Sequence, residues 1–305
     1  MAEQAFSPAR SGCTFRKMHL ALIAHNKTET NLRLVEAAPR GIEMSIICPA
    51  ESLNLLRSGD AALGRLDVLP TVDGIESGTW EIARLTTEGI VVLNGLPTLL
   101  ATHDKLQTSR ILVAGGLPHP RTAHLAEPGA PLPLEPPVVI KPRFGSWGRD
   151  VVVCRDHAEA KIELERLAGR SWFKDTGALV QELVPPPGRD LRIVVAAGAV
   201  VGAIQRIAAP GEWRTNVALG GVRRPASPPP AARELALAAA AAAEGDLVGV
   251  DLLPTPDGGW VVLELNGAVE FTDEYSLDRD VFAAAAEALV AAASRPPQEE
   301  VAALA

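Results

Sequence analysis

The stretch VVIKPRFGSWGRDVVVC, residues 138–154, contains two short β runs, VVIK and VVVC, joined by a glycine-bearing loop of hairpin type. Gly145, Ser146 and Gly148 lie in this loop, and Lys141 ends the first run. Glycines let backbone amides approach phosphate oxygens, and the lysine adds positive charge. The loop matches neither GxGxxG nor GxxxxGK(S/T) and leads from strand to strand, which excludes the usual dinucleotide and P-loop sites. An ordinary glycine turn is the alternative that the loop alone leaves open.

A second pattern lies near the C-terminal end, where Asp251 stands in GVDLLP and Glu264 in VLELNG, two residues before Asn266. Apolar runs at 248–253 and 260–265, around a PDGG turn, predict a hairpin. Residues at i and i+2 of a strand share a face, and the paired strand brings Asp251 to them. Three oxygen ligands on one face suit Mg²⁺, or Mn²⁺ in its place, held jointly with nucleotide phosphates. Solvent-facing strand ends are a weaker alternative, because charges inside apolar strands are costly.

The segment between these patterns supplies amide, carboxylate and arginine side chains. Guanidinium groups bind carboxylates and phosphates through a two-pronged fork, so several arginines around a metal would organise anionic substrates. Any one of them alone is more often a surface charge. The residues singled out in this segment are Gln181, Glu182, Asp190, Arg192, Arg206, Arg214, Asn216, Gly220 and Gly221.

Residues 18–100 alternate strand-length apolar runs with segments of helical spacing. The predicted strands lie at 18–25, 42–48, 66–69 and 90–94, and the predicted helices at 28–38 and 80–88. This alternation predicts a parallel sheet with crossover helices, and therefore a small α/β domain.

The rest of the chain is predicted to form two further units. The proline-rich stretch 118–137 is predicted to be a connection rather than a packed element. Further helices are predicted at 104–112, 157–167, 228–244 and 281–293, and further strands at 178–183, 191–195 and 199–205. The chain is thus divided into a flexible N-terminus (1–17), an N-terminal α/β domain (18–100), a central subdomain (101–176), a C-terminal subdomain with the metal site (177–293) and a flexible tail (294–305).

The 305 residues include 29 Lys and Arg against 37 Asp and Glu, which gives a formal net charge of −8. This balance argues against general binding to nucleic acid or to an anionic membrane. Cys13, Cys48 and Cys154 have no CxxC spacing and fit neither a disulfide framework nor a cysteine zinc site. The N-terminus lacks the apolar core of a signal peptide, and the longest apolar tract, 235–243, is too short to span a bilayer. We therefore expect a cytoplasmic protein that binds neither nucleic acid nor membrane.

Six motifs follow one another in the chain: THDK with Lys105, KPRFGSWGR, VQELVPPPGRDLRIVV, RTNVALGG, GVDLL and ELNGAVEF. In this order they resemble the ATP-grasp ligases typified by LysX and RimK, and GSWGR with N-x-x-x-E-F favours the LysX branch. The resemblance implies an α/β ATP-grasp fold with an N-terminal Rossmann-like (pre-ATP-grasp) domain, in which the central subdomain is a lid. Lys105 and Lys141 are two of only six lysines, and they fall where ATP-grasp enzymes place phosphate-binding lysines.

The resemblance also implies a role for each motif residue. ATP would be held by Lys105, Lys141, Gly145, Ser146, Trp147, Gly148, Gln181, Glu182, Leu183, Val184 and Asp190. The γ-phosphate and an acyl phosphate would be oriented by Arg192, Arg206, Arg214 and Asn216. Mg²⁺ would be ligated by Asp251, Glu264 and Asn266. The substrates would be held by Gly220, Gly221, Glu270 and Phe271, of which Glu270 and Phe271 would help to recognise the amine.

By the same resemblance, the protein is an ATP-dependent ligase that joins a carboxylate to an amine through an acyl phosphate. The LysX branch implies an amino acid as the amine and the C-terminal glutamate of a small acidic amino-group carrier protein as the carboxylate, in amino-acid biosynthesis. The basic loop 206–224 would dock the carrier, and a homodimer or homotetramer is expected. The alternatives are a RimK-like glutamate ligase acting on another protein or a small molecule, and, from another class, an ATP-binding regulatory module without turnover.

The sequence departs from the LysX pattern just after the metal-site residues. Phe271 is followed by Thr272, Asp273 and Glu274, where LysX-type ligases continue with lysine, and Asn266 is followed by Gly-Ala-Val. The acidic pair leaves the identity of the amino acid open and allows a positively charged one.

Overall fold

The N-terminal part of the computed structural model, which describes residues 17–295, is a four-stranded parallel sheet in the order β2-β1-β3-β4. Its elements are β1 (His19–Ile23), α1 (Glu29–Glu36), β2 (Glu43–Ile47), α2 (Pro49–Leu55), β3 (Ala61–Gly64), α3 (Thr79–Thr87) and β4 (Val91–Leu93). The predicted parallel sheet with crossover helices is confirmed. The predicted flexible ends, 1–17 and 294–305, lie almost entirely outside the described residues.

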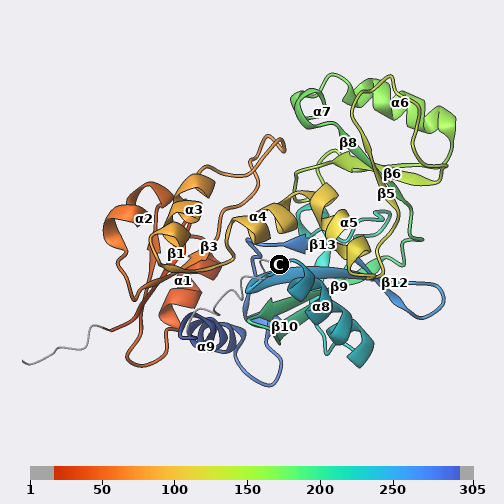
Figure 1. The fold of residues 1–305 in the computed structure, drawn as a ribbon. Coiled ribbons are helices and arrows are strands. Elements are labelled where there is room, and N and C mark those ends of the chain that lie inside the picture. Colours follow the sequence, from red (N-terminus) through yellow and green to blue (C-terminus); the bar gives the residue numbers. More distant parts are fainter. Residues whose placement is uncertain (1–16, 296–305) are drawn as a thin grey trace, which may run out of the picture.

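The third strand of this sheet lies earlier than predicted. β3 is the fully buried AALG segment, and residues 66–69 instead begin a projecting segment, 66–78, closed by an isolated bridge between Val68 and Ile75 (Figure 1). The prediction of a strand at 66–69 is wrong. The small residues of β3 have weaker hydropathy than the leucine-containing run 66–69 that follows them, so the sequence pattern favoured the later run. Small size is required at Gly64, because a Cβ there would lie 2.3 Å from the Asn94 carbonyl oxygen.

The lid subdomain is an antiparallel sheet in the order β5-β8-β6-β7, covered by two helices. Its elements are β5 (Thr122–Leu125), β6 (Val138–Pro142), β7 (Val152–Cys154), α6 (His157–Leu167), α7 (Ser171–Thr176) and β8 (Ala178–Glu182). The predicted hairpin around the glycine loop is confirmed, since β6 and β7 pair antiparallel. The proline-rich stretch contains β5, so the prediction of a mere connection is wrong there; the strand is held by pairing with β8, which lies far along the chain.

The C-terminal part is an antiparallel five-stranded sheet in the order β11-β10-β9-β12-β13. Its elements are β9 (Arg189–Ala196), β10 (Ala199–Ile207), β11 (Val222–Pro225), α8 (Pro230–Ala242), β12 (Leu247–Pro254), β13 (Trp260–Asn266) and α9 (Val281–Ala293). The lid lies above this sheet in Figure 1, and the N-terminal domain lies to the left. Two helices at the join, α4 (Leu96–His103) and α5 (Lys105–Ala114), connect the three parts.

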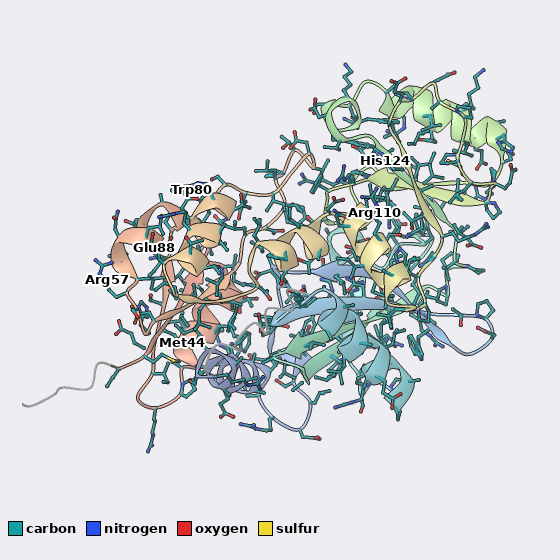
Figure 2. The ribbon with its side chains drawn as sticks, viewed as in Figure 1. Met44, Arg57, Trp80, Glu88, Arg110 and His124 are labelled. Carbon is teal, nitrogen blue, oxygen red and sulfur yellow. The ribbon has the colours of Figure 1, made fainter. Side chains whose placement is uncertain are left out.

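One hydrophobic core spans the N-terminal sheet, α9 and the large sheet, with Leu22, Leu63, Val194 and Phe282 among its buried members. Because apolar side chains of both sheets are buried in this one core, the N-terminal domain is fixed against the sheet that carries the site residues. Figure 2 shows Arg57 on the side of the N-terminal domain that faces away from the lid. Within the described part of the chain, no helix is long and apolar enough to cross a membrane.

Candidate active site

A cavity between the lid and the large sheet, about 980 Å³ including its open mouth, gathers most of the predicted site residues. Its walls come from the glycine loop, β6, β8, the start of α5 and the strands β9, β10, β12 and β13. The predicted residues that line it are Lys105, Lys141, Gly145, Ser146, Trp147, Gly148, Gln181, Glu182, Leu183, Val184, Asp190, Arg206, Arg214, Asn216, Asp251 and Glu264. Six others lie outside it: Arg192, Gly220, Gly221, Asn266, Glu270 and Phe271.

Two lysines approach the cavity from different elements. Lys105 is the first residue of α5, whose N-cap Asp104 accepts a hydrogen bond from the Leu106 N–H at 3.0 Å. Its ammonium donates to the Gly145 carbonyl at 2.5 Å and lies 3.6 Å from a Glu264 carboxylate oxygen. Lys141, on β6, is 5% exposed, and burial lowers its pKa to about 8, with Glu264 opposing the shift and Lys105 adding to it. Positive charge is therefore concentrated beside the glycine loop.

Opposite the lysines, the large sheet carries a buried network of arginines and carboxylates. The Asp251 carboxylate is 1% exposed and accepts from Arg192 at 2.6 and 2.7 Å and from Arg206 at 2.9 Å. Arg206 also donates to Asp190 at 2.8 and 2.5 Å, and the Thr215 hydroxyl donates to Asp190 at 2.5 Å. Burial alone would raise the pKa of Asp251, but Arg192 and Arg206 outweigh it and hold that pKa below its usual range. Asp251 is therefore ionised at neutral pH.

The three predicted metal ligands share one face of the large sheet. Asp251 pairs with Glu264 across β12 and β13, and Gly249 pairs with Asn266 two residues away along the two strands. Asp251 and Glu264 line the cavity, and the Asn266 amide nitrogen points to the Gly249 carbonyl at 3.5 Å. No cluster of three His, Cys, Asp or Glu suited to a metal occurs within residues 17–295. Two carboxylates and one amide nevertheless fit Mg²⁺, which commonly takes one or two protein carboxylates and completes its shell with phosphates and water.

The other end of the cavity is apolar. Pro120, Val139, Leu183, Leu253 and Leu263 line it. The sequence patterns did not single out four of these five. A signal existed for two of them, because Val139 and Leu253 stand two residues from Lys141 and Asp251 on the same strands and so share their faces.

The glycine loop is closed over the cavity and held on two sides. Gly148 has φ +72°, and a Cβ there would lie 2.9 Å from the Asn216 amide oxygen. Arg214 donates to the Gly148 carbonyl at 3.0 Å, while its own pairing with Glu212 lowers the pKa of that carboxyl to about 2. On the other side, Arg149 donates to the Pro70 carbonyl in the projecting segment 66–78 at 3.1 Å. The loop therefore bridges the N-terminal domain and the large sheet.

The structure corrects the prediction for Phe271. Its ring is 1% exposed and stacks on Phe282 with centroids 4.9 Å apart, inside the core shared with the N-terminal domain, so it cannot contact a substrate in this conformation. Its neighbour Glu270 is half exposed and accepts from the buried Arg65 and from the Thr28 hydroxyl, both at 3.0 Å. Arg65 was not among the predicted residues, because its partners come from distant parts of the chain.

The predicted roles of Arg192 and of the pair Gly220 and Gly221 are also corrected, because these residues lie outside the cavity. Arg192 commits its guanidinium fork to Asp251 and does not line the cavity. Gly220 and Gly221 also lie outside it, where they shape the loop: Gly220 has φ +89°, and a Cβ on Gly221 would lie 2.5 Å from the Thr215 carbonyl oxygen. These glycines hold the backbone that presents Thr215 and Asn216 to the cavity.

Comparison with known proteins agrees with this geometry. The family model of the RimK-like ATP-grasp domain matches residues 102–290. The glutamate–LysW ligase ArgX of Sulfurisphaera tokodaii is 33% identical over 217 residues, which cover 69% of this chain and 76% of that protein. The α-aminoadipate–LysW ligase LysX of Saccharolobus solfataricus is 33% identical over 189 residues, which cover 60% of this chain and 68% of that protein.

Solved structures share the fold. A RimK domain ATP-grasp protein of Sphaerobacter thermophilus superposes with a TM-score of 0.63 at 23% identity, covering 89% of this chain and 99% of that chain. The D-alanine–D-alanine ligase of Bacillus anthracis complexed with ATP gives 0.66 at 16% identity, covering 91% and 97%. The predicted ATP-grasp fold is confirmed. The chain therefore belongs to the RimK-like ATP-grasp family, and it is a ligase that forms carbon–nitrogen bonds with ATP and a divalent metal.

Proposed function

We propose that this ligase uses ATP and Mg²⁺ to join the C-terminal glutamate of a small acidic carrier protein to the α-amino group of an amino acid. The observation that carries the proposal is a single cavity in which two lysines and a closed glycine loop face Asp251 and Glu264, with an apolar end beside them. The relatives ArgX and LysX are named as ligases of LysW, which supports a carrier protein as the acceptor.

The reaction has two steps. A carboxylate oxygen attacks the γ-phosphorus of ATP, the bond from that phosphorus to the bridging oxygen breaks, and ADP leaves. The amine nitrogen then attacks the acyl carbon of the acyl phosphate, phosphate leaves with the bonding electrons, and the nitrogen loses a proton to give the amide. Both steps require positioning and charge neutralisation more than a protein nucleophile.

In this assignment the nucleotide lies along the cavity. The adenine ring lies at the apolar end, between Val139 on the lid and Leu253 and Leu263 on the large sheet. Lys105 and Lys141 hold the phosphates, where their positive charge meets the backbone amides of the glycine loop.

Asp251, Glu264 and Asn266 would hold Mg²⁺. A divalent ion held by these residues would supply positive charge to offset that of the nucleotide phosphates. Arg192 then acts as a positioning residue, because its fork fixes both oxygens of Asp251. Arg206, Arg214 and Asn216 face the cavity and would orient the transferred phosphoryl group.

Glu270 is the residue that we assign to the amine. Its carboxylate is half exposed, and one oxygen is anchored by Arg65 and Thr28, which leaves the other oxygen for a substrate ammonium. Asp273 is less suited to read a cationic side chain, because Arg33 already donates to it at 2.7 and 3.1 Å. Of the acidic pair after Phe271, only Glu274 therefore still supports a positively charged amino acid as the substrate.

Glu270→Ala is expected to raise the KM for the amino acid about tenfold, since an exposed charge-assisted hydrogen bond contributes about 1 kcal/mol or slightly more. The KM for ATP should stay unchanged. Asp273→Asn, a neighbouring loss of one negative charge, is the control and should leave both constants unchanged. An unaltered KM for every amino acid tested in Glu270→Ala would remove this residue from the amine site.

Turnover with a carrier is the direct test of the function. Purified enzyme is incubated with ATP, Mg²⁺, a panel of amino acids and small acidic proteins ending in glutamate, and phosphate release and carrier mass are measured. A carrier mass increased by one amino-acid residue is expected. Phosphate release with free amino acids alone would instead identify a small-molecule acceptor.

The predicted basic loop 206–224 begins in β10 and ends in β11, and Arg206 and Arg214 are paired with carboxylates, so the proposed docking surface for an acidic carrier depends on Arg223 and Arg224. Arg224 on the edge strand β11 is exposed, so Arg224→Glu is expected to raise the KM for the carrier about 3- to 10-fold, with a smaller effect at high salt. Arg57→Glu makes the same charge change on the side of the N-terminal domain that faces away from the lid, and it should have no effect (Figure 2). Equal effects of the two variants would locate the docking surface elsewhere.

The cytoplasmic location and the homo-oligomeric assembly stay predictions. Among the described residues, the thiols of Cys48 and Cys154 are free, and burial raises the pKa of Cys154 to about 11, which makes that thiol a poor nucleophile.

A further inference from the structure

A chain of polar side chains runs from Lys141 away from the cavity. The Lys141 ammonium donates to the Gln181 side-chain oxygen at 2.8 Å. The Gln181 amide nitrogen lies 2.8 Å from the Thr122 hydroxyl oxygen and 3.5 Å from His119 Nε2. His119 Nδ1 lies 2.8 Å from the carbonyl oxygen of Val262. The chain therefore connects a lysine of the lid to strand β13 of the large sheet.

The hydrogen bonds of this chain fix which lone pairs face the Gln181 amide. The Val262 carbonyl can only accept, so His119 Nδ1 carries the proton. Burial lowers the pKa of His119 to about 4, so the ring is neutral at neutral pH and Nε2 presents a lone pair. The single proton of the Thr122 hydroxyl faces the Pro120 carbonyl at 2.9 Å or His119 Nε2 at 3.2 Å, and with either acceptor the hydroxyl keeps a lone pair for Gln181.

The Gln181 amide is oriented as a result. Its NH₂ group must face the lone pairs of Thr122 and His119, so its oxygen faces Lys141. The reversed amide would set NH₂ against the ammonium and an oxygen against two lone pairs, in a place where Gln181 is 2% exposed and water cannot relieve the mismatch. With one N–H bound to Gln181, the other two N–H groups of Lys141 are free to point into the cavity.

We propose that His119 is a positioning residue for the ligase: its Nδ1–H tautomer, fixed by Val262, sets the amide of Gln181 so that its oxygen anchors the Lys141 ammonium toward the nucleotide phosphates. His119 does not line the cavity and acts only through Gln181. Val262 stands two residues before Glu264, so the same contact ties the phosphate lysine to the strand that carries a metal ligand. A second bond, from the Val262 N–H to the Pro118 carbonyl at 2.9 Å, holds the two segments in register. The inference rests on the proposed role of Lys141.

A double-mutant cycle tests this role. Affinity for a nonhydrolysable ATP analogue with Mg²⁺ is measured by calorimetry for the wild type, His119→Leu, Lys141→Met and the double variant. His119→Leu is expected to weaken binding about 3- to 10-fold in the wild-type background and to have no further effect when Lys141 is methionine. His119→Gln keeps an acceptor toward Gln181 and should recover most of the loss, whereas a stability effect alone would not depend on the residue at 141.

The outcomes distinguish the positioning role of His119 from the phosphate contact of Lys141. Equal weakening by His119→Leu in both backgrounds would overturn the positioning role while leaving the phosphate assignment of Lys141 intact. Unchanged affinity in Lys141→Met would overturn that assignment instead. If His119→Leu does not fold, the cycle is run with Thr122→Val, which removes the other acceptor of the Gln181 amide; coupling of Thr122→Val to Lys141 supports the anchoring of Lys141 through Gln181, and strict additivity contradicts it.

Discussion

Asp251→Ala is expected to lose both turnover and folding stability. The carboxylate is 1% exposed and is the shared partner of Arg192 and Arg206. Removing one partner of a buried ion pair leaves an uncompensated charge, which costs about 3–5 kcal/mol of the free energy of unfolding. Because Arg206 keeps its two bonds to Asp190, we expect a loss of about 3 kcal/mol. Phosphate release should fall about 10²- to 10³-fold, as charge stabilisation of the transferred phosphoryl group is lost.

Glu264→Ala separates the two effects. Its side chain is 21% exposed, and the Lys105 ammonium, 3.6 Å away, keeps the Gly145 carbonyl as a partner. Turnover should fall as in Asp251→Ala, while the free energy of unfolding, measured by urea denaturation, should change by less than about 1 kcal/mol. Full activity in either variant would contradict the metal assignment, and equal destabilisation of both would contradict the buried network.

The arrangement of the three proposed metal ligands on the large sheet could be predicted because it depends on a local rule. Alternation along a strand places Glu264 and Asn266 on one face, and a short hairpin brings Asp251 beside them. The same rule, applied to β6 and β12, would also have found Val139 and Leu253 at the apolar end of the cavity.

Which carboxylate each buried arginine binds could not be predicted from the sequence, because it depends on how strands far apart in the chain pair with each other. Arg192 faces Asp251 only through the register of β9 against β12, and a guanidinium beside a phosphate site could equally have pointed at the nucleotide. Phe271 illustrates the same limit, because its neighbours in the chain, Glu270 and Thr272, are polar, and only the packing of α9 against the N-terminal sheet buries its ring. β3 and β5 are short and weakly apolar, so their strand character comes from tertiary pairing.

Lys141→Met is expected to weaken binding of a nonhydrolysable ATP analogue about 10- to 100-fold, the loss of one hydrogen-bonded charge contact of about 1.5–3 kcal/mol. It should also change the pH dependence. Burial lowers the pKa of Lys141 to about 8 in the unliganded protein, with Glu264 opposing and Lys105 adding to the shift. Nucleotide phosphates favour the ammonium, so the analogue binds the protonated form and raises this pKa.

The sign of the pH effect follows. Below about pH 8 the ammonium is already present and wild-type affinity is constant; above it, binding must take up a proton, and affinity falls by up to about tenfold per pH unit. Calorimetry between about pH 7 and about pH 9.5, on either side of that pKa, in two buffers of different ionisation enthalpy, measures both the affinity and the proton uptake. Lys161→Met, on the exposed face of α6, should retain the wild-type slope. Because methionine cannot titrate, a slope that persists in Lys141→Met would assign the proton to another group, and unchanged affinity in that variant would leave Lys141 without its proposed contact to phosphate.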